Sequence, residues 1–373
     1  MFALFSILIL LAPSKGFSQI SQEKILKAEV IQILSEKETE TPEGTRIRQQ
    51  NLLLRGLEGE ILDREFRVDG ISDMIVLKNS RYEVGDAVLV TKSPDPRGNE
   101  QFYITDYVRT SSLAWLTAIF LFIVLFVAKK KGARSLMVLA LTFGIIIYFL
   151  VPALVAGYNA LALSLVAGMA ILFLAIFATE GFNKKSMIAY VSLIISLTLA
   201  ILLSWLFTEF SRLTGLGDDD ALTLLGMANQ TIQLKGLLLA GMVIGTLGVL
   251  DDIVISQISV CWELSATNPR LPSSHIYKKA MRVGIDHINA IVNTLFLAYA
   301  GAGLPLLVIF SYRQEPFMDM FDILNNEIIA TEIVRTLVGS ISLVLAVPIA
   351  TILASNAFAG KATIDSEHVA HKH

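Results

Sequence analysis

The sequence has little charge and almost no cysteine. Charged residues make up 17% of its 373 residues, and Cys261 is the single cysteine. One cysteine cannot form an internal disulfide, so a disulfide framework is excluded and we interpret Cys261 as a small buried residue. Charge this sparse, together with 54% hydrophobic residues, excludes an ordinary soluble globular protein. The sequence therefore predicts an integral membrane protein.

Recognisable catalytic motifs are also missing. The sequence contains no Walker A motif, no HExxH pair, no GxSxG elbow and no CxxC pair. It has no ordered set of metal ligands, and no basic surface that would favour nucleic acid. We therefore expect no enzyme activity, no cofactor, no metal site and no nucleic-acid partner.

The N-terminus has the pattern of a secretory signal. Residues 2–12 are apolar and then Pro13 and Lys15 interrupt them, which makes the apolar run too short to cross a bilayer. Small residues near Ser18 predict cleavage there, so residues 1–18 are interpreted as a signal peptide. The segment before the apolar run has no Lys or Arg, and an uncleaved anchor is the alternative.

Residues 19–110 are polar and have the alternation of β-strands. Apolar and polar residues alternate over several short stretches of this segment, which predicts about five strands and a small β domain, OB-like or a small barrel. The predicted strands lie near 25–31, 51–55, 61–68, 82–90 and 101–108.

A transmembrane helical domain is predicted over residues 111–358, followed by a tail at 359–373. Seven apolar stretches are long enough to count as spans, although the first is short. They cover residues 113–128, 135–156, 159–178, 187–208, 235–258, 284–310 and 329–356.

The charges of the connecting loops predict the orientation. Lys129, Lys130 and Lys131 follow the first span, and further Lys and Arg residues follow the third and fifth, whereas the alternate loops are acidic. The positive-inside rule places the basic loops in the cytoplasm. An odd number of spans then places residues 19–110 outside the cell and the tail in the cytoplasm. The secretory signal predicts the same external location.

The fifth span carries a single stripe of small and polar residues. On a helical wheel these residues fall within about 40° of Asp252. They are Gly241, Gly245, Gly248, Asp252, Ser256, Ser259 and Glu263. We interpret the glycines as a helix-packing surface, because small residues let another helix approach closely in a membrane.

Asp251 and Asp252 are the only charges within residues 237–262. Ionised carboxylates are costly inside a bilayer, so they remain only where they face protein or water. One interpretation is a structural pair that locks the bundle. The other, which we favour, is a proton or cation site with Asp252 as its leading residue.

The sixth span carries a second polar stripe. Arg282, Asp286, Asn289 and Asn293 lie within about 60° of one another on the wheel. If spans five and six are antiparallel, both asparagines approach the depth of Asp252, where they form either structural hydrogen bonds or a polar pathway. The run from Ala300 to Pro305 predicts a break in the same span.

Two other charged groups are interpreted as ordinary features. Glu332 and Arg335 are three residues apart on the seventh span, which is typical of a local ion pair. Asp218, Asp219 and Asp220 lack the spacing of a calcium loop and are interpreted as solvated charge.

A family resemblance rests on the fifth and sixth spans. The runs GTLGVLDDIVISQ at 245–257, WEL at 262–264, RVGIDHI at 282–288 and NTL at 293–295 resemble the YibE/F family of bacterial membrane proteins. The layout agrees over nearly the whole chain. Members are described only as candidate permeases without an established substrate. The resemblance implies a bacterial cell membrane location and importance for Asp252, Glu263, Asp286 and Asn293.

Two functions are compatible with these observations. The first is a secondary transporter or ion- or proton-coupled permease in the lipid bilayer, with Asp252 and Asp251 as the titrating groups and an unknown small molecule or ion as substrate. The second is a non-transporting scaffold or sensor, whose external β domain binds a protein partner or a second copy of the chain.

Overall fold

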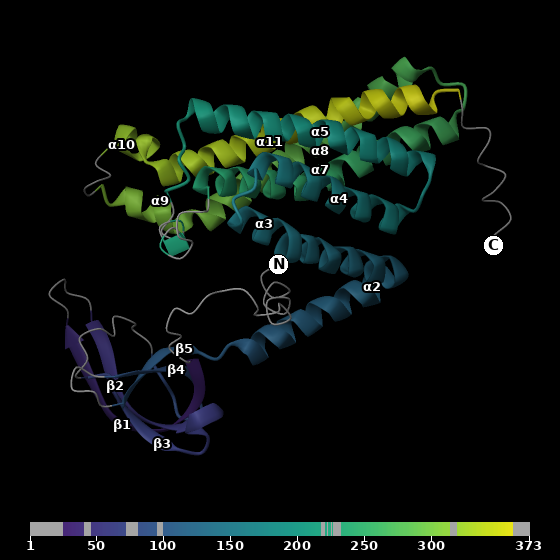
Figure 1. The fold of residues 1–373 in the computed structure, drawn as a ribbon. Helices are drawn as coiled ribbons and strands as arrows, with labels where there is room; N and C mark the ends of the chain where they lie inside the picture. Colours follow the sequence, from purple (N-terminus) through teal and green to yellow (C-terminus); the bar gives the residue numbers. More distant parts are fainter. Residues whose placement is uncertain are drawn as a thin grey trace. The chain divides into compact units, whose positions relative to one another are not determined.

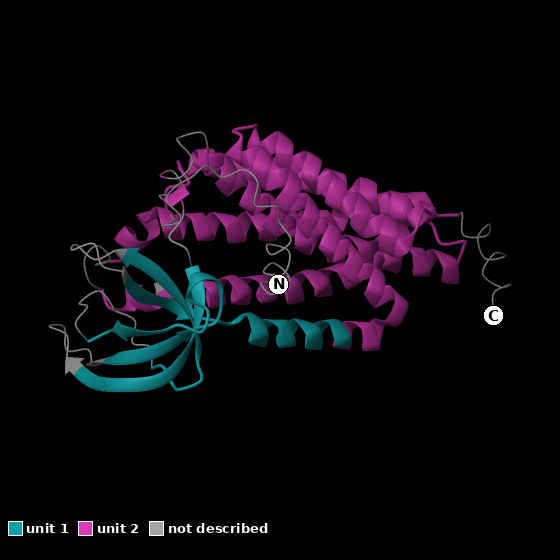
Figure 2. Cartoon of the chain, turned by 60° about the horizontal axis from the view of Figure 1, so that its bottom comes forward, with its two compact units in different colours: residues 1–7, 13–122 teal, residues 8–12, 123–373 magenta. Residues whose placement is uncertain are grey.

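The computed structural model describes residues 25–40, 46–71, 81–94, 100–217, 221, 223–224, 226, 233–313 and 319–360. The predicted signal peptide at 1–18, the three aspartates at 218–220 and all but the start of the tail lie outside the described residues. The described chain forms two compact units, and their boundary at residues 122 and 123 lies within a helix (Figure 2).

The first unit contains a five-stranded antiparallel sheet, which confirms the predicted β structure. The sheet has the strand order β3-β2-β1-β4-β5, so β1 is its central strand. Val30 of β1 pairs with Leu54 of β2, and Ala28 pairs with Val88 of β4. The strands are β1 (Ile25–Glu40), β2 (Arg46–Gly56), β3 (Glu65–Asp69), β4 (Ala87–Pro94) and β5 (Glu100–Tyr107), with a 3-10 turn η1 (Gly59–Ile61) before β3.

The sheet encloses its own apolar core. Inward-facing residues of β1, β2 and β4, including Ala28, Leu54 and Val88, are fully buried, as the alternation of a half-buried strand requires. The rings of Phe66 on β3 and Phe102 on β5 lie 4.2 Å apart, so the two edge strands approach each other. The sheet is thus curved toward a small barrel, while the OB-like assignment stays a prediction.

The helical segment after β5 contains both of the first two predicted spans. It comprises α2 (Thr110–Ile145), a π-helical turn η2 (Ile146–Leu150) and α3 (Val151–Val155). Lys129 interrupts α2 with φ 49° and ψ −126°. A Cβ atom on Gly132 would lie 2.6 Å from the carbonyl oxygen of Val124, although eight residues of straight helix span about 12 Å. The chain therefore reverses at Lys129, and glycine permits the close approach.

The second unit is a helical bundle built around α5, α7 and α11 (Figure 1). Each of these three helices packs against the other two, α4 packs beside α5 and α7, and α8 packs beside α11 and α7. Asn159 and Asn183 cap the N-termini of α4 and α5, because their side-chain oxygens accept hydrogen bonds from backbone amides of the first turn. The helices are α4 (Ala160–Glu180), α5 (Lys184–Phe210), α7 (Leu234–Thr267), α8 (Ser273–Ala302), α9 (Leu304–Ser311), α10 (Met320–Asn325) and α11 (Glu327–Phe358).

Six helices of the described chain are long and apolar enough to cross a membrane. The first of them, residues 110–155, holds the two predicted spans 113–128 and 135–156 on either side of the reversal at Lys129. The predicted count of seven spans requires the segments before and after Lys129 to cross the membrane separately. This count stays a prediction. The predicted break in the sixth span is confirmed, because α8 ends at Ala302 and α9 begins at Leu304.

A buried glutamine and a glycine hold α8 against the bundle. The Nε2 group of Gln257 on α7 donates to the carbonyl oxygen of Ala280 on α8 and to the hydroxyl of Thr351 on α11, each at 2.8 Å. A Cβ atom on Gly284 would lie only 2.6 Å from Cγ1 of Val347. Three helices therefore meet around the Gln257 side chain. A residue larger than glycine at position 284 would clash with Val347.

We expect Gly284→Leu to destabilise the bundle, because overpacking against a stiff β-branched neighbour costs about 1–3 kcal/mol. Gly301→Leu is the matched control, because Gly301 lies on the same helix and a Cβ atom there would meet nothing within 4 Å. Thermal unfolding of both purified variants in detergent checks this. Equal melting temperatures for the two would contradict the close packing of α8 at Gly284.

Candidate functional site

The glycine stripe of α7 lies on the exposed side of this helix. Gly241, Gly245, Gly248 and Asp252 are exposed, whereas the opposite face of α7 is buried. An added Cβ at Gly241 or Gly248 would meet nothing within 4 Å, and at Gly245 it would meet only the Tyr299 hydroxyl at 3.7 Å. Within the described chain, α8 approaches the stripe at Gly245 through Tyr299, and the helix-packing role of the three glycines stays a prediction.

The acidic pair lies in the middle of α7 in two different environments. Asp251 is half-buried, and its Oδ1 atom is buried without a hydrogen-bond partner among the described residues. Asp252 is exposed on the glycine face. Burying a carboxylate oxygen without a donor is unfavourable. Asp251 is therefore the less well accommodated of the two acids, although its position on the glycine stripe made Asp252 the leading candidate in the sequence analysis.

The remaining stripe residues lie along the C-terminal half of α7. Ser256 and Ser259 are half-buried and Glu263 is exposed. The Ser259 hydroxyl donates to the carbonyl oxygen of Ile255 at 2.8 Å, which satisfies it within its own helix. The exposed residues of the stripe are thus its three glycines and its two acids, Asp252 and Glu263.

The polar stripe of α8 is turned away from α7. Ile288, Ile291 and Leu295 of α8 pack against the core of the bundle. Asp286, Asn289 and Asn293 are exposed and lie roughly on the opposite side of the helix. No hydrogen bond between described residues joins either asparagine to Asp252. The two stripes therefore do not face each other within the described chain, and a role for the asparagines at the depth of Asp252 stays a prediction.

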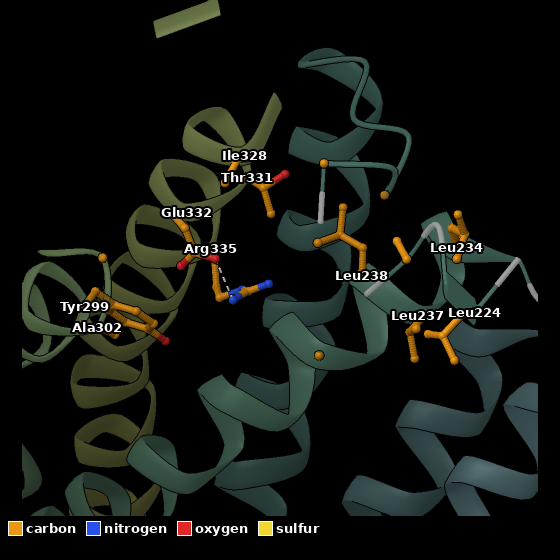
Figure 3. Close-up of a pocket in the computed structure, with 15 residues that line it drawn as sticks. Leu224, Leu234, Leu237, Leu238, Tyr299, Ala302, Ile328, Thr331, Glu332 and Arg335 are labelled. Carbon is orange, nitrogen blue, oxygen red and sulfur yellow. Dashed lines mark hydrogen bonds and ion pairs between the residues drawn. The ribbon is translucent and has the colours of Figure 1, made fainter. Parts of the chain in front are cut away.

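A cavity of about 410 Å³ lies at the end of the bundle where α7 begins and α8 ends (Figure 3). α7 contributes Leu234, Leu237, Leu238 and Gly241 to its wall. α8 contributes Tyr299 and Ala302, and Gly303 lies at the helix break. The cavity therefore adjoins both the start of the glycine stripe and the interruption of the sixth predicted span. Its volume is within the range of small-molecule sites.

The polar part of the cavity wall comes from α11. Thr331, Glu332 and Arg335 face the cavity from this helix (Figure 3). Arg335 Nη1 donates to Oε1 of Glu332 at 2.7 Å, which confirms the predicted local ion pair. Its position in a cavity wall was not predicted, because sequence spacing shows which residues of a helix are neighbours but not what they face.

The rim of the cavity is held by a second carboxylate that the sequence analysis missed. Oε1 of Glu327, at the start of α11, accepts hydrogen bonds from the backbone amides of Thr214 at 2.7 Å and Gly215 at 2.8 Å. The Thr214 hydroxyl also donates to Oε2 at 2.9 Å. Gly215 has φ +82°, and an added Cβ there would lie 2.7 Å from the backbone of Leu234. Glycine thus lets this loop close one side of the cavity.

The cavity and Asp252 share one helix face. Gly241 lines the cavity, and Asp252 lies on the same face about 16 Å farther along α7. Among the described residues, no group of three or more His, Cys, Asp or Glu side chains is arranged to hold a metal ion. The arrangement therefore combines a partly polar cavity at one end of the bundle with two carboxylates in its apolar middle.

Comparison with known proteins identifies the family of the chain. Searches of curated proteins and of solved structures give no match. The family model described as YibE/F-like protein matches residues 116–360, which is most of the chain and includes the acidic pair and the cavity. With its six candidate spans, the chain is a multi-pass membrane protein that belongs to the YibE/F-like family.

Proposed function

We propose that the protein is a secondary transporter, an ion- or proton-coupled permease of a bacterial cell membrane. In this proposal Asp252 and Asp251 bind the coupling ion, and the substrate enters through the cavity at the start of α7. The β unit lies outside the cell and the C-terminal tail lies in the cytoplasm. Asp286, Asn289, Asn293, Ser256 and Glu263 remain candidates for a polar path along the exposed faces of α7 and α8.

The observation that carries the proposal is the poor accommodation of the acidic pair. Asp251 has a buried oxygen without a partner among the described residues, and Asp252 lies in an otherwise apolar stretch. A pair retained only to lock the bundle would be expected to have donors from neighbouring helices. Carboxylates that lack such donors are suited to bind and release a cation instead.

The break between α8 and α9 gives independent support. Secondary transporters commonly form their sites at discontinuous helices. Gly303 at this break lines the cavity. A route for a substrate therefore begins where the membrane helix is interrupted.

The loop charges support an opening toward the cell exterior. The opposite end of the bundle carries Lys184 and Lys185 at the start of α5 and Arg270 after α7. The positive-inside rule favours the cytoplasm for that end. The cavity end would then face outward.

The alternative is a scaffold or sensor that does not transport. It is favoured by the β unit, which has a core of its own and is therefore suited to bind a partner independently. Under this alternative, removing residues 19–110 abolishes function and substitution of Asp252 has no effect.

For the permease, we expect Asp252→Asn to reduce proton or cation coupling at least about tenfold, because an amide keeps the shape of the acid but does not exchange a proton. The measurement is the collapse of an imposed pH gradient in proteoliposomes, read by an internal pH dye. Asp252→Glu should recover part of the coupling. Glu180→Gln, an exposed acid at the end of α4, is the matched control.

Unchanged coupling in Asp252→Asn would overturn the role of this residue. Lost coupling accompanied by aggregation in size-exclusion chromatography would instead indicate a structural pair. The two results are distinguished by thermal unfolding of the same preparations before reconstitution.

We also expect Asp251→Asn to stabilise the protein, by about 1 kcal/mol or more. The substitution removes the cost of an ionised, partly buried carboxylate while keeping its shape. The melting temperature in detergent at mildly alkaline pH should rise for Asp251→Asn and change less for Asp252→Asn, whose side chain is exposed. A lower melting temperature for Asp251→Asn would show that Asp251 has a stabilising partner.

A further inference from the structure

We infer that the cavity binds a small zwitterion with an ammonium group, a carboxylate and an aliphatic body, which is the chemistry of an aliphatic amino acid. The inference rests on the proposed function, since it names the class of substrate that the permease takes up. It is carried by the ion pair in the cavity wall and by the residues opposite that pair.

The ion pair is open on its cavity side. Arg335 and Glu332 are joined by a single hydrogen bond of 2.7 Å, and 30% and 39% of their side-chain surfaces are exposed. A guanidinium has five N–H donors and a carboxylate has about four acceptor positions. Both groups therefore retain hydrogen-bonding capacity that a ligand of the opposite charge can use.

The balance of charge selects a ligand without net charge. Of the described residues that line the cavity, Glu332 and Arg335 are the two charged ones, so their sum is zero. A monoanion would leave one negative charge uncompensated in a site bounded by apolar helices, which is costly. A zwitterion leaves none, because its carboxylate meets Arg335 and its ammonium meets Glu332.

The remaining wall determines the body of the ligand. Leu234, Leu237 and Leu238 of α7 and Leu224 form apolar surface across the cavity from α11 (Figure 3). The volume of about 410 Å³ accommodates a small molecule. A compact aliphatic side chain fits this surface, while the hydroxyls of Tyr299 and Thr331 lie near the polar side.

The loop from Thr214 to Gly217 makes the cavity preformed. Glu327 fixes Thr214 and Gly215 through charge-assisted hydrogen bonds, and these bonds are the stronger kind. Gly217 approaches α11 closely, with an added Cβ 3.1 Å from the backbone nitrogen of Ile328. A fixed rim lowers the entropy lost when a ligand is bound.

The test is equilibrium binding of radiolabelled L-leucine to the purified full-length chain in detergent, without any ion gradient. Two analogues compete: 4-methylpentanoate, which lacks the ammonium, and leucinamide, which lacks the carboxylate. We expect saturable leucine binding and affinities at least about tenfold weaker for both analogues, because each leaves one charge of the pair unmatched.

Variants of the pair make the test specific. Arg335→Gln should weaken leucine binding at least about tenfold, and Glu332→Gln should weaken leucine binding while strengthening that of 4-methylpentanoate. If the ion pair were purely structural, Glu332→Gln would not shift the preference of the cavity from leucine to 4-methylpentanoate. Lys235→Gln is the matched control, because Lys235 pairs with Glu209 at 2.6 Å at the same end of the bundle and does not line the cavity.

If both pair variants fail to fold, Gly241→Leu provides an independent test. A Cβ atom added at Gly241 meets nothing within 4 Å, and Gly241 is part of the cavity wall, so the variant should fold and weaken leucine binding by occupying space. Leucine binding that is unaffected by Gly241→Leu would overturn the inference.

Two further outcomes would also overturn it. One is the absence of leucine binding to the wild-type chain, and the other is binding of 4-methylpentanoate as tight as that of leucine, which would indicate an anion site. The proposed coupling is judged separately in proteoliposomes. Leucine binding with unchanged coupling in Asp252→Asn would uphold the cavity and refute only the acidic pair as the coupling site.

Discussion

The cost of placing polar groups among apolar helices governs this protein. Many of its buried hydroxyl groups are satisfied by hydrogen bonds within their own helix. Hydroxyls such as Ser192, Ser342 and Thr351 each donate to the carbonyl oxygen of the residue four positions earlier. Gln257 meets this cost across three helices, and Glu332 with Arg335 meets it as an ion pair. Several buried polar atoms of the described residues still lack a hydrogen-bond partner, and Asp251 is the one carboxylate among them.

Features that depend on neighbouring residues in the chain were predictable from the sequence. Alternation predicted the strands near their observed positions, and apolar runs predicted the helices, because both patterns are set by local geometry. The break at Gly303 and the pair of Glu332 and Arg335 were found for the same reason. Even the reversal at Lys129 agrees with the basic gap between the first two predicted spans.

Features that depend on lateral contacts were not predictable. A helical wheel shows that residues share a face but not what that face meets, so the sequence placed the asparagines of α8 near the depth of Asp252 but could not show that their stripe lies on the exposed side of α8. Gln257 and Gly284 were overlooked because one buried amide and one close approach leave little trace in a single sequence. The contact of Glu327 with Thr214 joins residues 113 positions apart, and a pattern of local spacing cannot indicate it.

The separation between the cavity and the acidic pair constrains any coupling between them. About 16 Å of α7 lies between Gly241 and Asp252, so a ligand in the cavity cannot touch the acids, and coupling requires an element that both sites bias. α8 is suited to this role. Its apolar stretch is hardly buried, whereas half of the corresponding stretch is buried in α4, α7 and α11. α8 supplies Tyr299 to the cavity, and that hydroxyl lies beside Gly245 on the stripe leading to Asp252. A shift of α8 therefore changes the cavity wall and the open face of α7 together.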